Sequence, residues 1–419
     1  MIYFTSMEEK KILFSTWGMP AQWKDITYTY DEMSVHACTT LKLLSKKYDR
    51  VILFVLDSIA DFNGVSNSSQ CGTCYSQSFK DFIYSGSYSD VISSIEERTK
   101  KMLACLGIED AEVIVLPAKG KPGGRMQFNG DVKDYLSIAL LSSYIRIKED
   151  LRSASQIGLD ITHGINFLPT LTFQAVMTLM YAALISGNNE KIWFKVYNSD
   201  PATPLVNNVA INVMYEREVS HICVEGKNVE RAIRTKGEKF SDLSRHFNMV
   251  YSNEVYPLIS TLLNPFPLAA AKLSSISKID VQWMLNGWIE SSSIDLGSVF
   301  HDIHYDPVAI EQAVIADAFL NRMREFNCGD CCDINLIDKI TKEIYKKVSL
   351  ENYYILEQEI SDIRRKASDY QCGPCKPNKR IMVAHGGFQK ECVEVQNDHV
   401  KYCNWDKIFE FIKTFERPR

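Results

Sequence analysis

Two short segments of the chain contain the residue types best suited to chemistry. The first runs from Asp160 to Asn166 (DITHGIN) and combines hydroxyl, imidazole and amide side chains with a glycine. The second runs from Arg380 to His385 (RIMVAH) and separates an arginine from a histidine by four residues. Histidine moves protons near neutral pH, and arginine stabilises a charged phosphorane. The first segment therefore predicts a ligand site, and the second predicts RNA cleavage without a metal.

The segment from Asp160 to Asn166 directly follows a predicted strand and precedes a predicted helix. Ligands of open parallel sheets bind at the carboxyl ends of strands, and a helix N-terminus favours a phosphate. In an alternative interpretation the segment only caps the helix and His163 is structural, but its position and polarity favour ligand binding. Trp17 ends the first predicted strand and should reach the same crevice, where it either stacks on a base or packs in the core. The candidate ligand-binding residues are Trp17, Gly18, Thr162, His163, Gly164 and Asn166.

Arg380 and His385 are the candidate catalytic residues. They lie in a basic segment, 361–391, which holds seven Lys or Arg against three Asp or Glu. Nowhere else in the chain does an arginine precede a histidine with four to six residues between them. Residues five apart on a helix point about 140° away from each other. This spacing favours a composite site that two copies of the chain form at a two-fold interface.

The sequence outside these segments offers no convincing metal cluster. The segment from His301 to Asp306 is rich in His and Asp, but we interpret it as a polar turn before a helix that starts at Pro307. No second carboxylate cluster of similar density accompanies it, as two-metal catalysis would require. The formal net charge of −5 argues against broad nonspecific binding of nucleic acid, although a local basic site remains compatible with it. We therefore expect catalysis without a metal.

The first half of the chain alternates predicted strands and helices. Apolar runs such as Val51 to Leu56 (VILFVL) are typical of strands buried on both faces of a parallel sheet. The alternation predicts an α/β fold with a Rossmann-like, doubly wound parallel sheet. Residues 58–87, rich in Ser, Gly and Asn, interrupt it as an insertion. The predicted strands are 11–17, 51–56, 112–116, 156–161, 191–197 and an edge strand over 209–213, and the predicted helices are 34–47, 88–106, 131–150 and 167–185.

After about residue 216 the spacing of apolar residues becomes helical throughout. We expect two domains, an α/β domain over 1–216 and an all-α domain over 217–419. The most apolar stretch, 167–185, contains Pro169 and several polar residues, so it reads as a buried helix and not a membrane span. The first residues lack a signal-peptide pattern. The predicted protein is cytoplasmic. Its second-half helices fall within 228–264, 278–290, 307–326, 334–366 and 404–416.

The chain has 12 cysteines, several in close pairs, which indicates either disulfides or metal sites. We favour disulfides that stabilise the fold, with Cys71–Cys74 holding the insertion. A zinc site formed by Cys328, Cys331, Cys372 and Cys375 is the alternative, but its linker is longer than usual. Cys372 to Cys375 (CGPC) is identical to the thioredoxin tetrapeptide, yet its predicted surroundings are not the βαβ setting of that enzyme, so we expect a structural disulfide here too.

With these motifs in view, the chain resembles the ancillary ribonucleases of type III CRISPR systems, which join a CARF sensor (a Rossmann-like fold) to a helical HEPN nuclease. Asp160 to Gly164 is similar to the family's sensor signature, and Arg380 to His385 is similar to its R-x4-H nuclease motif. Ile381 departs from the pattern, since many HEPN nucleases have a polar residue after the arginine.

The resemblance implies an endoribonuclease of antiviral defence that cuts single-stranded RNA without a metal, using the RNA's own 2′-hydroxyl. It implies a homodimer or higher homo-oligomer whose sensors bind a cyclic oligoadenylate, and cyclic tetra-adenylate is the ring size we expect. The alternative is a nucleotide-sensing regulator whose helical half binds a partner without cutting it. A single R-x4-H motif favours the enzyme.

Overall fold

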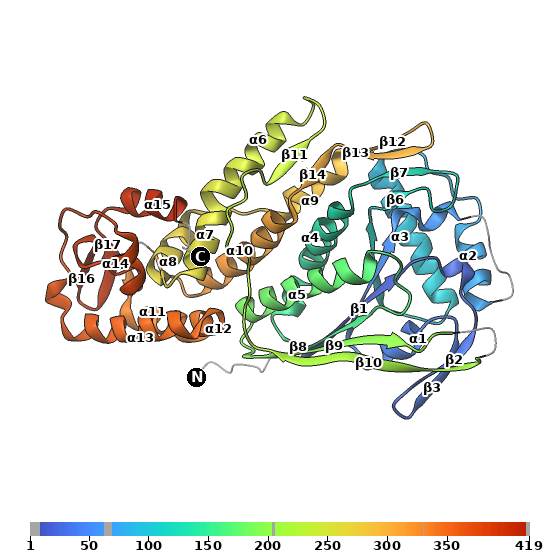
Figure 1. Cartoon of the computed structure of the whole chain (residues 1–419), viewed down its shortest axis with the longest axis horizontal. Coiled ribbons are helices and arrows are strands. Elements are labelled where there is room, and N and C mark those ends of the chain that lie inside the picture. Colours follow the sequence, from blue (N-terminus) through green and yellow to red (C-terminus); the bar gives the residue numbers. More distant parts are fainter. Residues whose placement is uncertain (1–8, 63–68, 203–205, 330, 416–419) are drawn as a thin grey trace.

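The computed structural model describes residues 9–62, 69–202, 206–329 and 331–415. Its N-terminal half is built on an eight-stranded sheet with the order β3-β2-β10-β9-β8-β1-β4-β5 (Figure 1). The strands are β1 (Lys10–Trp17), β2 (Ile26–Tyr30), β3 (Met33–Ala37), β4 (Arg50–Leu56), β5 (Ala111–Leu116), β8 (Ala154–Asp160), β9 (Ile192–Ser199) and β10 (Asn208–Val219).

The sheet is mixed, with mostly parallel strands. β1, β4, β5, β8 and β9 run parallel to one another, whereas β10 is antiparallel to β9 and β3 is antiparallel to β2. All residues from Val51 to Leu56 in β4 are buried, as a strand covered on both faces requires. The predicted α/β class is confirmed, with the antiparallel pairs as a feature that the apolar pattern does not reveal.

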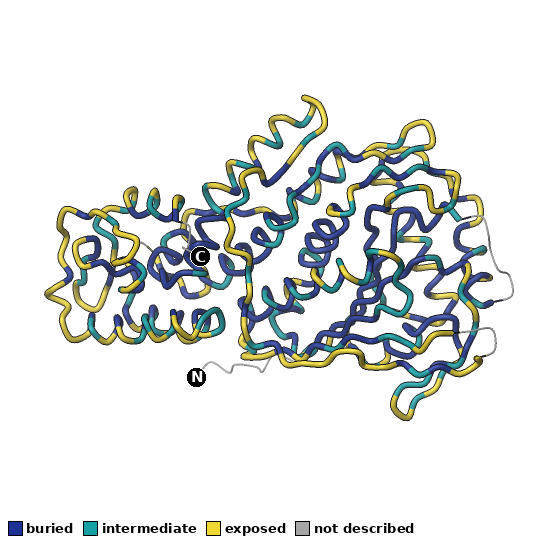
Figure 2. The backbone as a smooth tube through the Cα atoms, viewed as in Figure 1, coloured by how far each residue is buried: buried dark blue, intermediate teal, exposed yellow. Residues whose placement is uncertain are grey.

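Helices cover both faces of this sheet. The core on one face contains side chains of α4 (Val132–Leu151) and α5 (Leu168–Ser186). The core on the other contains side chains of α2 (Gln70–Phe79) and α3 (Tyr88–Cys105). By length and composition alone α5 could cross a membrane, but 61% of its apolar window is buried inside the protein, where α5 contacts the sheet, α4 and α10 (Pro307–Glu325). Figure 2 shows how buried backbone segments run through this layered arrangement.

Two of the sequence predictions for this half are wrong. The predicted helix over 34–47 begins as strand β3, which pairs with β2 in a hairpin, and only its second half is helical, as α1 (Leu41–Leu44) and a 3-10 turn (Ser45–Lys47). Pairing with β2 overrides the helical spacing, and Asp31, with φ of 52°, provides the left-handed residue of the hairpin turn. β10 is not an edge strand either, because β2 pairs with its first residues. It continues to Val219, across the predicted domain boundary at 216.

The second half is mainly helical, as predicted, but it also contains short strands that the sequence pattern did not indicate. The β12 and β13 hairpin extends a sheet with β6 (Lys119–Gly120) and β7 (Gln127–Asn129) of the first half. The helices are α6 (Ser241–Val250), α7 (Tyr256–Leu263), α8 (Pro267–Ile276), α9 (Val281–Glu290), α10 (Pro307–Glu325), α11 (Ile334–Ile340), α12 (Lys346–Val348), α13 (Leu350–Arg365), α14 (Lys379–Ala384) and α15 (Trp405–Lys413).

The short strands of the second half form three groups. β11 pairs with β14, β12 with β13, and β17 lies between β15 and β16. Residues 228–240, predicted to be helical, contain β11 instead. The strands are β11 (Ile233–Thr235), β12 (Ser292–Asp295), β13 (Ser298–His301), β14 (Ile303–Tyr305), β15 (Cys332–Asp333), β16 (Val393–Gln396) and β17 (His399–Tyr402).

Disulfides are present, but the predicted pairing is wrong for two of the three close pairs. Cys71 and Cys74 lie three residues apart in α2, and each bonds a cysteine distant in the sequence. Part of the predicted insertion, residues 63–68, lies outside the described residues. The disulfides are Cys38–Cys71, Cys74–Cys105, Cys328–Cys332, Cys372–Cys403 and Cys375–Cys392.

Because most of these bonds close long loops, they should stabilise the fold more than the small loops of the predicted pairs. Cys38–Cys71 spans 33 residues, so replacing both cysteines with Ala should lower the free energy of unfolding by roughly 3–4 kcal/mol. The matched control is Cys328→Ala with Cys332→Ala, which opens a span of 4 residues and should cost about 2 kcal/mol or less. Denaturant unfolding of both variants measures the difference, and equal losses would contradict the loop-length argument.

Candidate functional site

The crevice at the ends of β1 and β8 is organised by a buried carboxylate. Asp160, the last residue of β8, is fully buried. It accepts hydrogen bonds from the hydroxyls of Ser15 (3.2 Å) and Thr40 (2.7 Å) and from the backbone N–H of Thr162 (3.0 Å). A buried carboxylate is costly unless it is hydrogen-bonded. Asp160 therefore ties β1, the start of α1 and the segment after β8 together.

His163 forms the polar centre of this crevice. Its ring stacks on Trp23 with centroids 4.0 Å apart, and its Nε2 lies 3.4 Å from the backbone N of Thr40 and 3.5 Å from the hydroxyl of Tyr28. Burial lowers the pKa of the His163 imidazole to about 4, so the ring is neutral at neutral pH and can accept hydrogen bonds. Burial, with the charge of Asp160, raises the pKa of Tyr28, which keeps that hydroxyl a donor.

A cavity of about 470 Å³ opens beside His163. Its wall combines aromatic faces with backbone and side-chain polar groups, a composition that suits a nucleobase and its phosphate or sugar. Lys24 brings a positive charge, whereas Asp200 brings a negative one. The lining residues are Gln22, Trp23, Lys24, Ile26, Tyr28, Cys38, Thr162, His163, Asn198, Ser199, Asp200, Pro201 and Ala202.

The predicted ligand-binding residues divide into two groups. Thr162 and His163 line the cavity, and the Thr162 hydroxyl accepts a hydrogen bond from the backbone N of Ser199 (3.1 Å). Gly18 and Gly164 shape the backbone around it. Gly18 donates its N–H to the carbonyl of His163 (2.9 Å), and a Cβ on Gly164 would lie 2.5 Å from Oγ1 of Thr16.

Asn166 and Trp17 are not part of the cavity wall. Asn166 is exposed, with φ of 52°, at the turn before α5. Trp17 is fully buried and packs edge-on against Trp23, so a base cannot stack on it in this structure. The core-packing alternative describes Trp17, and the partly exposed Trp23 lines the cavity instead. The sequence did offer a signal for this residue, because Trp23 is a second tryptophan six residues after Trp17, just past the end of the strand.

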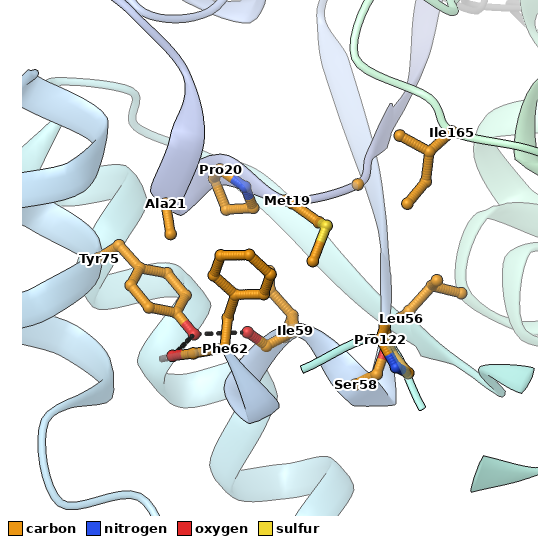
Figure 3. Close-up of a pocket in the computed structure, with 11 residues that line it drawn as sticks. Met19, Pro20, Ala21, Leu56, Ser58, Ile59, Phe62, Tyr75, Pro122 and Ile165 are labelled. Atoms are coloured by element: carbon orange, nitrogen blue, oxygen red, sulfur yellow. Dashed lines mark hydrogen bonds between the residues drawn. The ribbon is translucent and has the colours of Figure 1, made fainter. Parts of the chain in front are cut away.

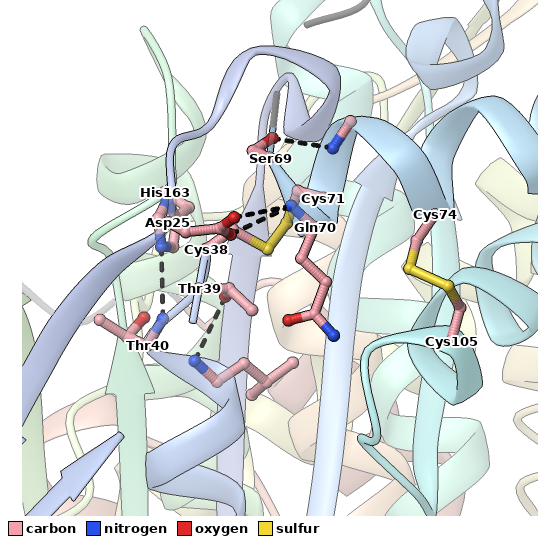
Figure 4. The surroundings of a disulfide bond; sticks show 12 residues. Asp25, Cys38, Thr39, Thr40, Ser69, Gln70, Cys71, Cys74, Cys105 and His163 are labelled. Atoms are coloured by element: carbon pink, nitrogen blue, oxygen red, sulfur yellow. Dashed lines mark hydrogen bonds between the residues drawn. A yellow bond between two sulfur atoms is a disulfide. The ribbon is translucent and has the colours of Figure 1, made fainter. Parts of the chain in front are cut away.

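The disulfide Cys38–Cys71 forms part of the same wall. Cys38 lines the cavity, and Thr40, two residues later, contacts His163 (Figure 4). The Thr40 hydroxyl also donates to Asp160. The disulfide attaches this wall to α2, whose first turn is also held by Asp25, which accepts from the backbone N of Gln70. The insertion therefore supports the candidate ligand site directly.

A second, smaller pocket lies beside Gly18 (Figure 3). Its volume is about 20 Å³ and its wall is almost wholly apolar, with Met19, Phe62 and Ile165 among its residues, so it is too small for a nucleotide. The glycine-rich loop from Gly120 to Arg125 closes one side through Pro122. Asp61 holds that loop by accepting a hydrogen bond from the backbone N of Gly123 (3.0 Å). We therefore assign the loop a role in packing and not in binding phosphate.

Arg380 lies in α14 and His385 directly follows it, at the opposite end of the long axis from α2 (Figure 1). Asn378 caps the helix by accepting from the backbone N of Arg380 (3.1 Å) and of Ile381 (3.2 Å). The Arg380 side chain is exposed, and among the described residues it makes no hydrogen bond or ion pair. His385 follows the last helical residue as the C-cap, with its side chain 45% exposed. Both candidate catalytic side chains are thus accessible to a large substrate.

His385 has a buried carboxylate behind it. Its Nδ1 lies 3.0 Å from Oε2 of Glu359, and the hydroxyl of Tyr370 donates to Oε1 of the same carboxylate at 2.5 Å. Glu359 is 5% exposed and Tyr370 is 2% exposed. Burial and the bond to Glu359 raise the pKa of Tyr370, so its hydroxyl keeps the proton. Neither residue was a candidate from the sequence, because Glu359 is 26 residues away from His385.

The cysteines around α14 are structural. Cys372–Cys403 and Cys375–Cys392 join the loop before α14 to the β16–β17 hairpin and its flanks. The predicted Cys372–Cys375 bond and the alternative zinc site are both contradicted, since Cys328, Cys372 and Cys375 each form a disulfide with another cysteine. The same pairing is incompatible with a thioredoxin-like dithiol.

The segment from His301 to Asp306 is not the predicted turn. It forms the end of β13 and the whole of β14, and only Asp306 caps α10. His301 is buried, stacked on Trp288, and His304 Nδ1 lies 2.8 Å from the buried Asp134. Within the described ranges, no group of three or more His, Cys, Asp or Glu side chains is arranged to hold a metal ion.

Comparison with known proteins gives three matches. A family model described as the CARF domain of the CRISPR system endoribonuclease Csx1 matches residues 12–201, and one described as the HEPN domain of Csx1 matches residues 333–403. The CRISPR system endoribonuclease Csx1 of Methanocaldococcus jannaschii is 28% identical over 200 residues, covering 46% of this chain and 37% of the relative. This chain therefore matches little more than a third of that relative. The two family models together cover more than half of the chain.

Proposed function

The chain belongs to the Csx1 family of CRISPR-associated CARF–HEPN proteins, and we propose that it is an endoribonuclease of type III CRISPR antiviral defence. In this proposal a cyclic oligoadenylate binds the CARF domain, over 1–216, and activates the HEPN domain, over 217–419, to cut single-stranded RNA. The protein acts in the cytoplasm. The observation that carries the proposal is the accessible pair of Arg380 and His385 in the segment that the HEPN family model matches.

The chemistry follows from these two side chains. His385, with its Nδ1 against Glu359, presents Nε2 to a substrate and can take the proton of a 2′-hydroxyl. The unpaired guanidinium of Arg380 can hold the phosphate and stabilise the charge of the phosphorane. Attack by the 2′-hydroxyl breaks the bond from phosphorus to the 5′-oxygen, and leaves a 2′,3′-cyclic phosphate and a 5′-hydroxyl. No step in this scheme needs a metal.

The sensor chemistry follows from the cavity beside His163. Trp23 offers an aromatic face, Tyr28 a hydroxyl donor and Lys24 a cation, which together suit a base and a phosphate. The cyclic ligand touches neither catalytic residue, so it must act by shifting a population. Moving an equilibrium from 1:99 to 99:1 needs about 5.5 kcal/mol of preference for the active state. A ring of several nucleotides bound across two subunits supplies enough contacts for that.

We expect cleavage in EDTA to occur at ordinary phosphodiesters and to fail at a single 2′-deoxy position. The test is digestion of a labelled RNA with one 2′-deoxy substitution at the main cut site, with cyclic tetra-adenylate or cyclic hexa-adenylate present. Activity should fall by about 10²–10⁴-fold in His385→Ala. Cleavage at the deoxy position, or its loss on adding EDTA, would overturn the mechanism. Full activity of His385→Ala would remove His385 from the mechanism, whereas no cleavage by the wild type with either activator would favour the non-catalytic regulator.

Trp23 should set the affinity for the activator. We expect Trp23→Ala to raise the activator concentration for half-maximal cleavage by roughly ten- to hundred-fold, because stacking on a base contributes about 1–3 kcal/mol. His163→Ala should act in the same direction. The matched control is Trp193→Ala, which removes a 44% exposed tryptophan of β9 that does not line the cavity. Unchanged titrations for both Trp23→Ala and His163→Ala would place the ligand elsewhere.

We also expect a homodimer or a higher homo-oligomer, because one active site would combine Arg380 and His385 of two chains. Light scattering on the purified protein measures the mass, and mixing inactive Arg380→Ala and His385→Ala subunits tests the shared site. The mixed population should stay well below wild-type activity, since each mixed site keeps only one arginine and one histidine. A fully active monomer would refute this.

A further inference from the structure

The residues that hold His385 in place lie outside the R-x4-H motif. His385 itself is the C-cap of α14: its backbone N–H donates to the carbonyl of Ile381, but this bond does not fix the orientation of its imidazole. Glu359 comes from the middle of α13, and Tyr370 follows the short 3-10 turn after that helix. The carboxylate of Glu359 has both oxygens occupied, Oε1 by the Tyr370 hydroxyl and Oε2 by His385 Nδ1.

The burial of this carboxylate leaves His385 as the only member of the group that a substrate can reach. Glu359 and Tyr370 are nearly inaccessible, whereas the His385 side chain is 45% exposed, so the imidazole lies at the surface with the carboxylate beneath it. A carboxylate can only accept hydrogen bonds. The nitrogen of His385 that faces it must therefore carry the proton, and Nε2 of the neutral ring must carry the lone pair.

We propose that Glu359 is a positioning residue for His385: it fixes the orientation and the Nδ1-protonated tautomer of the imidazole, and Tyr370 fixes Glu359. This inference rests on the proposed ribonuclease function. In that reaction Nε2 accepts the proton of the 2′-hydroxyl, so the imidazole becomes an imidazolium whose positive charge lies against the carboxylate. The proton on Nδ1 stays where it is. Glu359 does not contact the RNA.

Tyr370 is held in turn by contacts to its backbone carbonyl and to its ring. Its carbonyl accepts a hydrogen bond from the backbone N of Val395 in β16, and the Lys390 ammonium lies 5.6 Å from the centroid of its ring. Lys390 also pairs with Asp369 at 2.9 Å. The disulfide-linked hairpin therefore supports the Tyr370–Glu359–His385 chain from behind, which gives the cysteines near α14 an indirect role in positioning.

The decisive variant is Glu359→Gln, which keeps the size of the side chain. Since the Tyr370 hydroxyl donates to Oε1, the amide oxygen belongs at that position and the amide NH₂ faces Nδ1 of His385. An amide NH₂ donates to Nδ1 and moves the imidazole proton to Nε2. We expect kcat to fall about 100-fold, within the 10²–10⁴-fold range of a positioned proton-transfer group, with KM for RNA nearly unchanged.

Nitrogen-15 NMR of histidine-labelled protein provides a readout that does not depend on activity. The His385 signals, assigned by their loss in His385→Ala, should report a protonated Nδ1 in the wild type and a protonated Nε2 in Glu359→Gln. Tyr370→Phe removes only one hydroxyl and should lower kcat several-fold. The control is Glu357→Gln, on the same helix, whose carboxylate bonds Tyr353 and not His385; its kcat should match the wild type.

Wild-type kcat in Glu359→Gln, or a His385 tautomer that does not change, would overturn the positioning role. A large rise in KM with unchanged kcat would also overturn it, since that result would place Glu359 in RNA binding. A failure of the proposed ribonuclease function would give a different experimental result. If no RNA is cut by the wild type with any activator, the tautomer in the wild type and in Glu359→Gln still decides whether Glu359 orients His385.

Discussion

The sensor half depends on how one buried charge is satisfied. Asp160 has no exposure to water, and three hydrogen bonds from three different segments compensate its burial. Losing any donor would leave part of a carboxylate unsatisfied in the core, at a cost of about 1–3 kcal/mol or more. The Thr40 hydroxyl and backbone N reach Asp160 and His163 respectively, so the same residue connects the buried charge to the ligand cavity. The contacts of Thr40 that satisfy the Asp160 carboxylate therefore also position His163.

The sequence predicts the central strands well because their apolar runs have one physical explanation. Val51 to Leu56 and Ile12 to Phe14 are buried on both faces, and a continuous apolar run of that length has few other uses. Most of strand β3 was assigned to the helix that follows it because Val35 and Cys38 continue the helical spacing of Leu41 and Leu44. Pairing between Tyr28 and Val35, which lie in different strands, decides the outcome and is not visible in either segment alone.

The candidate sites show the same division between local and long-range information. Thr162, His163, Arg380 and His385 are recognisable because each pair lies within one short motif. Trp23, Glu359 and the disulfide partners are not, since only the fold brings Glu359 to His385 and Cys71 to Cys38. Trp17 was a reasonable candidate by position, but the strand end turns its ring into the core.

The two halves share one hydrophobic core, and this constrains how a ligand signal can travel. β13 of the second half pairs with β7 of the first, and His304 of β14 binds the buried Asp134 of α4. α5 begins directly after the segment that contains His163 and packs against α10 along its length. Close-packed interiors move between discrete arrangements and do not deform continuously.

A displacement at His163 therefore has a packed route through α5 into α10. From α10 the contacts continue through α7 and α8, and Phe266, at the start of α8, belongs to the same cluster as Met382 of α14. A flexible linker between independent domains would dissipate such a displacement. These contacts would couple the state of the sensor to the packing of the helix that carries Arg380, which is the condition that the proposed activation by population shift requires.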